Sequence, residues 1–429
     1  MQSAAGRAPG CDAGAALAVI ERFLKASREP ALIEPGEEIL PLKEGNYLLE
    51  SRNGRLLLQA WDETHNLVRR VKAVQSEARG KLELLVERFA RREGRLLLVD
   101  LARPSTLEWG RRSMRMVFRE RFREFLTRQF PGWRLAELST EANLEHSLSP
   151  AYPRAFLTQG QSAWAAIAAA PECQDVSEMV SFGLIWLDYL RHRERKLTVE
   201  GLVLYLPTGR EDSVCWRVQH LSPEAARYEL FVYSKEGYSA RIEPGHYRNL
   251  DTRLVPPPGG ETRPSSPQNP EAWLESQVLA QPEIIDASLD RSLIYQQVLA
   301  FAGGQRGIFD LLGTDRSGRL VVIELKVSAD LHLPLQALDY WMRVRWHHER
   351  NEFRRAGFFP GVELRPDPPR LLLVSPALEF HSTTETILGY FASQVDVERV
   401  GLGVEWRKGL RVLFRARGSV RPGHDAPGE

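Results

Sequence analysis

A run of six prolines within residues 255–270 constrains the fold of this chain more than any other feature of its sequence. Proline fixes φ and lacks a backbone N–H, so the run favours an extended polyproline conformation and cannot form a packed helix or central strand. We therefore expect a semi-rigid linker between two folded parts of the chain. For a length of 429 residues, the usual domain size predicts about three domains.

The first part of the chain, residues 1–112, predicts a small β-rich domain. After a stretch of helical apolar spacing at residues 15–26, the pattern changes to short apolar segments, which turn residues such as Asn53-Gly54 separate. Such a meander or small barrel is more often a scaffold or a dimer surface than a nucleic-acid binder. The expected strands are 47–50, 55–61, 67–74, 81–89 and 95–101.

Residues 113–254 predict a middle α/β domain, because helical and strand-like patterns alternate along them. Residues 163–170 fit either a strand or a short helix, since the segment is short and almost wholly apolar. Helices are expected at 114–130 and 180–191, and strands at 133–138, 153–157, 202–206, 228–233 and 239–242.

The last part of the chain, residues 271–429, predicts a mixed sheet with helices on both faces. Its first helix can be capped by Asn269, with Pro270 at the first helical position. Further helices are expected at 335–350 and 383–394, and strands at 294–301, 307–312, 319–326, 370–375, 397–405 and 410–415. The fold class expected for the whole chain is therefore multidomain α/β (α+β).

A predicted hairpin at residues 307–326 brings acidic side chains together. If it turns about Ser317, Asp310 lies directly opposite Glu324, and the alternation of side chains points Lys326 the same way. Two carboxylates so close repel each other, and burying them is costly unless a cation bridges them. We therefore expect a divalent metal ion at this site. The alternative is that the acids only form salt bridges with Lys326 or Arg319.

The hairpin residues and their neighbours along the chain resemble a known constellation. It consists of Glu275 in a helix, Asp310 in one strand, Glu324-Leu325-Lys326 in the next, and Gln336 and Tyr340 in the following helix. This pattern resembles the PD-(D/E)XK nuclease superfamily, which has the restriction-endonuclease-like fold, and within it the RecB-type and mismatch-endonuclease branch. The resemblance covers about residues 271–415, and it departs from the family name at Phe309, where proline is implied.

The resemblance implies a hydrated metal ion, Mg²⁺ or Mn²⁺, as the cofactor. Asp310, Glu324 and the Leu325 carbonyl would bind it, because hard cations prefer oxygen ligands. Glu275 would add a second carboxylate, directly or through water. Taken alone, each acid is an ordinary surface or turn residue, and only the combination indicates a site.

The resemblance also implies roles in catalysis for three further side chains. Lys326 would hold the attacking water, help to deprotonate it, and stabilise charge on the scissile phosphate. Gln336 would orient the nucleotide or a ligand water, and Tyr340 would pack near the nucleic-acid backbone or touch it. The implied reaction is the in-line hydrolysis of a phosphodiester bond.

A basic run in and after the helix of Gln336 predicts contacts with nucleic acid. Trp341 and Trp346 lie within it and could stack on an unpaired base. The alternative is a solvated arginine-rich helix with two core tryptophans. The cationic residues are Arg343, Arg345, His347, His348, Arg350, Arg354 and Arg355.

A further hypothesis is that the middle domain is a degenerate copy of the last domain. The segment Leu187-Asp188-Tyr189-Leu190 echoes Leu338-Asp339-Tyr340-Trp341, and an apolar strand follows each. Residues 166–170 stand where Glu-x-Lys is expected, and they contain neither acid nor lysine. A lost nuclease site now used for binding or dimerisation would explain this pattern, whereas chance similarity of one helix is the alternative. A different strand order in the two domains would exclude the copy.

Charge and cysteine content bound the remaining expectations. The net charge of +1 means that any contact with nucleic acid has to come from local patches. Three cysteines without a CxxC pair indicate a reducing, cytoplasmic location, and no apolar run is long enough for a membrane span. We expect a Mg²⁺-dependent phosphodiesterase, a DNA endonuclease of repair or defence that can form a homodimer. The rival is a non-catalytic nucleic-acid-binding or assembly protein that keeps the nuclease fold.

Overall fold

The computed structural model of the chain forms two compact units, residues 1–126 and residues 127–429. It describes residues 13–34, 39–52, 54–61, 66–87, 93–173, 175–234, 237–247, 252–254, 269–302 and 305–418. The predicted Pro-rich linker therefore lies outside the described residues, apart from Asn269 and Pro270. The described parts contain three sheets with helices between them, which confirms a mixed, multidomain α/β class.

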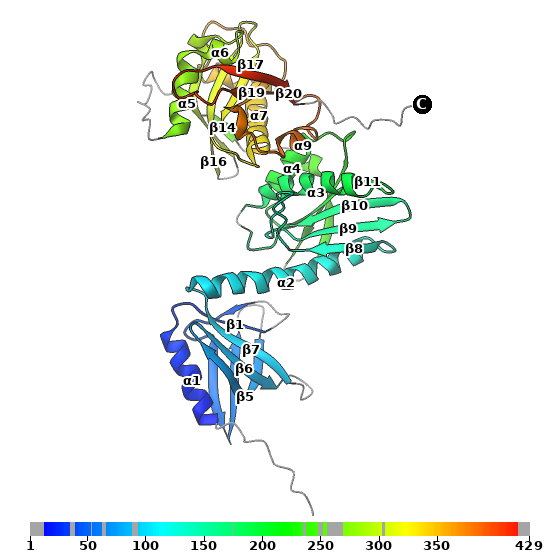
Figure 1. Ribbon diagram of the computed structural model, residues 1–429, viewed down its shortest axis with the longest axis vertical. Coiled ribbons are helices and arrows are strands. Elements are labelled where there is room, and N and C mark those ends of the chain that lie inside the picture. The colour runs from blue at the N-terminus through cyan, green and yellow to red at the C-terminus, as the bar shows by residue number, and fades with distance from the viewer. Residues whose placement is uncertain are drawn as a thin grey trace, which may run out of the picture. The chain divides into compact units, whose positions relative to one another are not determined.

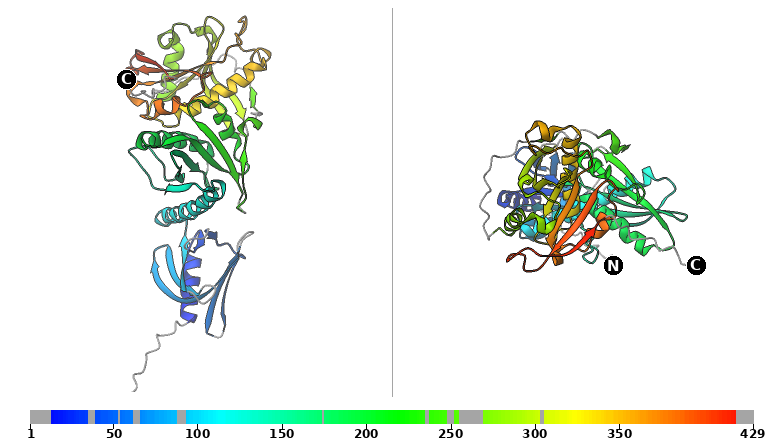
Figure 2. Two further views of the ribbon diagram at one scale, coloured as in Figure 1. Left: turned by 90° about the vertical axis from the view of Figure 1, so that its right-hand side faces the viewer. Right: turned by 90° about the horizontal axis from the view of Figure 1, so that it is seen from above.

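The described part of the first unit contains a seven-stranded antiparallel sheet, helix α1 and most of helix α2 (Pro104–Gln129) (Figure 2). The five strands predicted here form a meander, and two short strands that the sequence did not predict extend it in the order β2-β1-β7-β6-β5-β4-β3. The bounds are α1 Ala13–Ala26, β1 Pro30–Ile33, β2 Leu40–Pro41, β3 Tyr47–Arg52, β4 Arg55–Trp61, β5 Asn66–Ala78, β6 Lys81–Glu87 and β7 Glu93–Asp100.

The core of this unit follows from alternating apolar residues on its strands. In β6 every second residue is buried, and Leu82, Leu84 and Val86 have no exposed surface. They pack with Ile20 and Phe23 of α1, so the helix covers the apolar face of the sheet. Such a face cannot remain in water, and α1 removes it from solvent.

Helix α2 corrects the predicted boundary between the first and middle domains. It spans Pro104–Gln129 and so crosses residue 112, where the sequence placed that boundary. No proline lies between Pro104 and Pro131, and proline is tolerated at the first helical position, so the helix can start at Pro104. None of the helices in the described ranges is both long and apolar enough to span a membrane.

The second unit contains two sheets, the first of which has six strands in the order β13-β12-β11-β10-β9-β8. The segment that fitted either a strand or a helix is strand β10, paired parallel with β11 and antiparallel with β9. Helix α3 connects β10 to β11, and the short helix α4 connects β11 to β12 (Figure 1). The bounds are β8 Arg134–Ser139, β9 Arg154–Gln159, β10 Ser162–Ala168, α3 Met179–Arg193, β11 Thr198–Pro207, α4 Asp212–Val218, β12 Arg227–Tyr233 and β13 Ser239–Ile242.

The second sheet of this unit has seven strands in the order β14-β15-β16-β17-β18-β19-β20. Strand β14, which the sequence placed in the middle domain, pairs antiparallel with β15 and belongs to this last sheet. Helix α7 connects β17 to β18, and α9 connects β18 to β19 (Figure 1). The bounds are β14 Thr252–Leu254, α5 Pro270–Ala280, α6 Pro282–Ile285, β15 Tyr295–Ala302, β16 Gln305–Thr314, β17 Leu320–Leu325, α7 Leu333–Glu349, α8 Glu352–Arg355, β18 Arg370–Pro376, α9 Thr384–Leu388, β19 Asp396–Leu402 and β20 Val412–Arg417.

Strands β8 to β13 repeat the arrangement of strands β15 to β20. In each set the second strand pairs antiparallel with the first and third, the third and fourth pair parallel, the fourth and fifth pair parallel, and the sixth is antiparallel. A helix joins the third strand to the fourth and another joins the fourth to the fifth in both. The two domains therefore have the same strand order, so the hypothesis that the middle domain is a copy of the last one is not excluded.

The two halves of the second unit meet through equivalent elements. Helix α3 contacts α9 and α7 contacts α4, so each half contributes the same two helices. Between them Leu221 and Phe391, which occupy similar places after α4 and α9, form an antiparallel bridge. Arg217 of α4 donates two hydrogen bonds to Asp339 of α7, at 2.9 and 2.8 Å. This reciprocal pairing is the pattern of a two-fold symmetric dimer, here built within one chain.

Candidate active site

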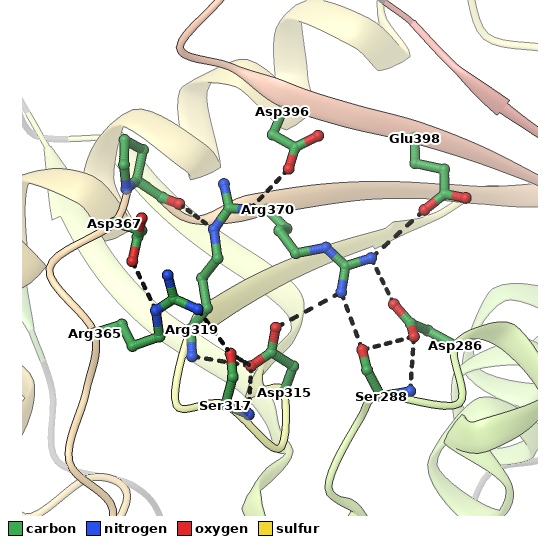
Figure 3. Close-up of polar contacts among 11 residues, drawn as sticks. Asp286, Ser288, Asp315, Ser317, Arg319, Arg365, Asp367, Arg370, Asp396 and Glu398 are labelled. Carbon is green, nitrogen blue, oxygen red and sulfur yellow. Dashed lines mark hydrogen bonds and ion pairs between the residues drawn. The ribbon is translucent and has the colours of Figure 1, made fainter.

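The turn of the β16–β17 hairpin is fixed by Asp315, whose contacts Figure 3 shows, and by Gly318. Asp315 accepts hydrogen bonds from the Ser317 N–H at 2.9 Å, the Ser317 hydroxyl at 2.6 Å and the Arg319 N–H at 3.0 Å. Gly318 has a φ of +83°, and a Cβ there would lie 2.3 Å from the Glu363 carbonyl oxygen. Only glycine fits this position, so the turn has one geometry and sets the register of both strands.

Two arginines hold the same end of the sheet (Figure 3). Arg319 lies 2.8 Å from Asp396, and Arg370 lies 2.6 Å from Asp286 and 3.5 Å from Glu398. Arg319 is therefore engaged at the turn end of the hairpin and does not pair with Asp310 or Glu324. This removes half of the salt-bridge alternative that the sequence left open.

The hairpin register places Asp310 opposite Glu324. Leu311 pairs with Ile323, and Leu312 with Val322, so the next position in the same register joins the two acids. This is the register predicted from a turn about Ser317, and it is confirmed. By alternation both carboxylates share the sheet face of Leu312 and Val322, which belongs to the core beneath α7.

Asp310 is held at the end of the hairpin by a main-chain contact. Its Oδ2 accepts a hydrogen bond from the Leu325 N–H at 2.8 Å. Burial raises the pKa of this carboxyl to about 6, against the opposing effects of the Leu325 hydrogen bond and the Lys326 charge, with Glu271 adding to the rise. Asp310 thus titrates near neutral pH in the metal-free protein.

Glu324 is the more deeply buried of the two acids, at 4% exposure. Its Oε2 is buried and has no hydrogen-bond partner among the described residues. Burial raises the pKa of Glu324 well above its ordinary value, and the negative charge of Asp310 raises it further. Burying a carboxylate oxygen without a partner costs free energy, and binding a proton or a cation would remove that cost.

Lys326 lies beside the acids but pairs with two others. Its Nζ is 3.6 Å from Glu271 and 3.7 Å from Asp330. Burial lowers the pKa of Lys326, but the negative charges around it, those of Glu271 and Asp330 first, outweigh burial and leave this pKa raised. In the described structure neither Asp310 nor Glu324 forms an ion pair, so the salt-bridge alternative is wrong for Lys326 as well as for Arg319.

Helix α5 supplies the acidic side chain that reaches this cluster. Its start is as predicted, because the Asn269 side chain accepts a hydrogen bond from the Ala272 N–H at 3.3 Å and Pro270 occupies the first position. Glu271, in the first turn, is the acid whose charge acts on Asp310 and Glu324. Glu275, predicted as a metal ligand, lies one turn later and is buried at 7% exposure. Its role as a ligand stays a prediction.

Sequence reasoning missed Glu271 and Asp330. For Glu271 a signal existed, because it is four residues before Glu275, and residues four apart share a helix face. Asp330 carried no signal, since it lies between β17 and α7, and only the path of that loop brings it to Lys326.

Helix α7 places Tyr340 next to the carboxylates. Burial raises the pKa of the Tyr340 phenol, and the charges of Glu324 and Asp310 raise it further, so the phenol stays protonated beside the acids. The Arg343 guanidinium lies 5.9 Å from the Tyr340 ring centre, which puts a positive charge on the same stretch of helix. Gln336 lies in the first turn of α7 and is partly exposed, and its role stays a prediction.

The predicted basic run divides into surface residues and core residues. Trp341 and His347 have no exposed surface, and the Trp341 Nε1 donates to the Pro369 carbonyl at 2.7 Å. The prediction that Trp341 and His347 contact nucleic acid is therefore wrong, because helical periodicity turns them into the core. Arg350 and Arg354 are exposed.

Arg345 and Trp346 of the same run each contact a neighbouring side chain at the surface. Arg345 is partly exposed and lies 2.7 Å from Glu349. The Arg350 guanidinium lies 3.2 Å from the ring centre of Trp346. A base could stack on Trp346 only if Arg350 moved or stacked with it, since cation and ring already face each other.

The donors of this site suit a hard divalent cation in type, although the set is small. Asp310, Glu324 and the Leu325 carbonyl offer oxygen, and the buried Glu324 Oε2 has no partner within the described ranges. Over those same residues, no three His, Cys, Asp or Glu side chains stand together closely enough to hold a metal ion. The fit therefore rests on two carboxylates and a main-chain oxygen. A comparison with known protein families finds no match, and neither does a comparison with curated proteins.

Proposed function

We propose that this chain is a Mg²⁺- or Mn²⁺-dependent nuclease of the PD-(D/E)XK type that hydrolyses phosphodiester bonds, and that its substrate is DNA. The observation that carries the proposal is a pair of carboxylates on adjacent strands, the buried Glu324 and the half-buried Asp310, with Lys326 beside them. Such a pair of like charges is unstable without a cation, so a metal ion is the group that would stabilise it.

A divalent cation held by Asp310, Glu324 and the Leu325 carbonyl would supply positive charge to polarise a phosphoryl oxygen. Lys326 stays protonated because its pKa is raised, so it serves to stabilise the negative charge that builds on the phosphate. Its predicted part in helping to deprotonate the attacking water stays a prediction.

The choice of a nucleic-acid substrate rests on the cations along α7 and just after it. Arg343 accompanies Tyr340 on α7, and Arg350 and Arg354 are exposed beyond the end of that helix. Contacts with phosphates hold a backbone in place without reading its sequence. Cys173 and Cys215 are free thiols, which fits the cytoplasm, where we place this enzyme in repair or defence.

The test is a panel of labelled single-stranded, duplex, flap and mismatched DNA incubated with Mg²⁺, Mn²⁺ or EDTA. The wild type is expected to cleave at least one substrate with metal and none with EDTA. Asp310→Asn, Glu324→Gln and Lys326→Met should each reduce the rate by about a thousandfold or more, because each removes a group required in the transition state. The readout is the initial rate at saturating substrate.

The matched control is Glu405→Gln, which removes an exposed carboxylate of the same half and should leave the rate unchanged. Cleavage by Asp310→Asn at the wild-type rate would refute the site. If the wild type binds DNA but cleaves nothing with either metal, the rival stands, namely a non-catalytic nucleic-acid-binding protein.

A further inference from the structure

The middle half of the second unit has positions equivalent to Asp310, Glu324 and Lys326 of the C-terminal site. The Lys326 N–H donates to the Val374 carbonyl of β18, two residues before Pro376 ends that strand. In the middle half the Ala169 N–H donates to the Tyr205 carbonyl, two residues before Pro207 ends β11. The two hydrogen bonds are the same contact in the two sheets, so Ala169 stands at the place of Lys326.

The remaining equivalences follow from strand pairing. Two residues before Ala169, Ile167 pairs with Leu204, as Glu324 pairs with Leu373. On its other side Ile167 pairs with Arg154 of β9, which therefore occupies the place of Asp310. The lysine and the glutamate are replaced by apolar side chains, whereas the aspartate is replaced by a cation.

Arg154 carries a positive charge in a buried position. It is 5% exposed, and its Nε and Nη1 are buried without a hydrogen-bond partner among the described residues. Burial lowers the pKa of Arg154, against the charges of Glu137 and Glu141, but an arginine remains protonated in any case. A buried guanidinium with unused N–H donors is as costly as a buried carboxylate without a partner.

Aromatic and cationic groups surround this guanidinium. It lies 5.5 Å from the ring centre of Trp186, and Tyr189, which matches Tyr340 in the aligned helices, stacks on Trp186 with the ring centres 5.6 Å apart. Arg193 is partly exposed, lies 5.2 Å from the Tyr189 ring centre and pairs with Glu137 at 2.9 Å. The ring centre of His146 lies 4.3 Å from the ring centre of Tyr189. The place of the metal site thus holds positive charge and stacking surfaces.

We propose that this converted site binds a phosphate group of the nucleic-acid backbone through Arg154, with Arg193 and Tyr189 beside it. The site would hold the backbone without cutting it, because Arg154 and Ile167 stand at the positions equivalent to Asp310 and Glu324 and neither can bind a metal ion. A phosphate suits the guanidinium better than the nearby acids do, since it presents several acceptor oxygens to a planar fork of donors. The identity of this ligand rests on the proposed nuclease function.

The test measures binding of a fluorescein-labelled DNA duplex to the full chain in EDTA, by anisotropy, so that cleavage plays no part. Arg154→Met is expected to weaken binding by about tenfold or more, because a charge-assisted hydrogen bond is lost. The slope of log affinity against log salt should become smaller by about one, as for the loss of one phosphate contact. Arg195→Met, at an exposed arginine two residues after Arg193, removes the same charge and should change affinity by less than about twofold.

Thermal melting of the free protein separates this role from a structural one. A buried charge without a partner destabilises the fold, so Arg154→Met should melt at the same or a higher temperature than the wild type. A lower melting temperature, failure to fold, or unchanged DNA affinity would each overturn the proposal. If the wild type cleaves DNA with Mg²⁺ while Arg154→Met binds it normally, this inference alone is refuted. If the wild type cleaves nothing, the nuclease proposal is refuted, and the anisotropy result still decides the role of Arg154.

Discussion

The two halves of the second unit have the same strand order but opposite charge at the same place. The C-terminal half has the buried Glu324 beside the half-buried Asp310, and the two acids repel each other, whereas the middle half has Ile167 and Arg154 at those positions. Each half therefore buries a charge that its own side chains do not neutralise. The comparison teaches that one strand order can place either two acids or an arginine at the same position, because the fold sets the place and the side chains set the charge.

The surface that joins the halves also differs from one side to the other. Around Asp339 of α7 the contact is a buried ion pair with Arg217, which is 5% exposed at its side chain. At the equivalent place on α3, Asp188 hydrogen-bonds to the Tyr390 side chain instead, and burial raises its pKa. The two halves thus share a fold, but Asp339 has an ion-pair partner whereas Asp188 has a hydrogen bond to a neutral side chain.

The largest effect on stability is expected from Asp339→Asn. It leaves the fully buried Arg217 charge without its carboxylate, which should lower the free energy of unfolding by about 3–5 kcal/mol. Urea titration would measure it. Arg227→Met serves as the control, because the Arg227–Glu200 pair is exposed and should contribute less than about 1 kcal/mol. Equal losses in the two variants would mean that Arg217 and Asp339 do not join the halves as described.

A smaller and pH-dependent effect is expected from Asp310→Asn in metal-free buffer. The pKa of Asp310 rises from 3.8 to about 6 on folding, so the folded state binds more protons between those values and loses stability as the pH rises through them. Asparagine removes this loss, so the variant should be more stable than the wild type at about pH 8, by at most about 3 kcal/mol.

At about pH 4 the two proteins should be equally stable, because the wild-type carboxyl is then protonated in the folded state. The measurement is the urea midpoint at several pH values in EDTA. A wild-type protein that gains stability with rising pH relative to Asp310→Asn would show that this carboxylate is stabilised by a partner.

The smallest effect is expected from Asp188→Asn in the middle half. Asparagine can keep a hydrogen bond to Tyr390, and the buried negative charge is already costly, so the change should be less than about 1 kcal/mol. Urea titration beside Asp339→Asn gives the comparison. A loss as large as that of Asp339→Asn would make the two sides of the joining surface electrostatically equivalent.

Much of the fold could be predicted because strands and turns leave local signals. The alternating residues of the first sheet, the cap of α5 and the turn about Ser317 are all local, and the structure has them as expected. The helix α2 was drawn too short because its first turns lack the apolar spacing that marked its end. Predicted helix 383–394 is shorter, Thr384–Leu388, since the chain turns after it to pair with the middle half.

The sequence by itself determined which residues are acidic, which turn is tight and which strands neighbour one another in the hairpin. It therefore determined that Asp310 and Glu324 meet, because register in a hairpin is a local property. Only the tertiary structure decided that Lys326 pairs with Glu271 and Asp330, that Trp341 is buried, and that Arg154 replaces an aspartate. Those contacts join segments far apart in the chain, and their distances depend on how helices and sheets pack rather than on any spacing in the sequence.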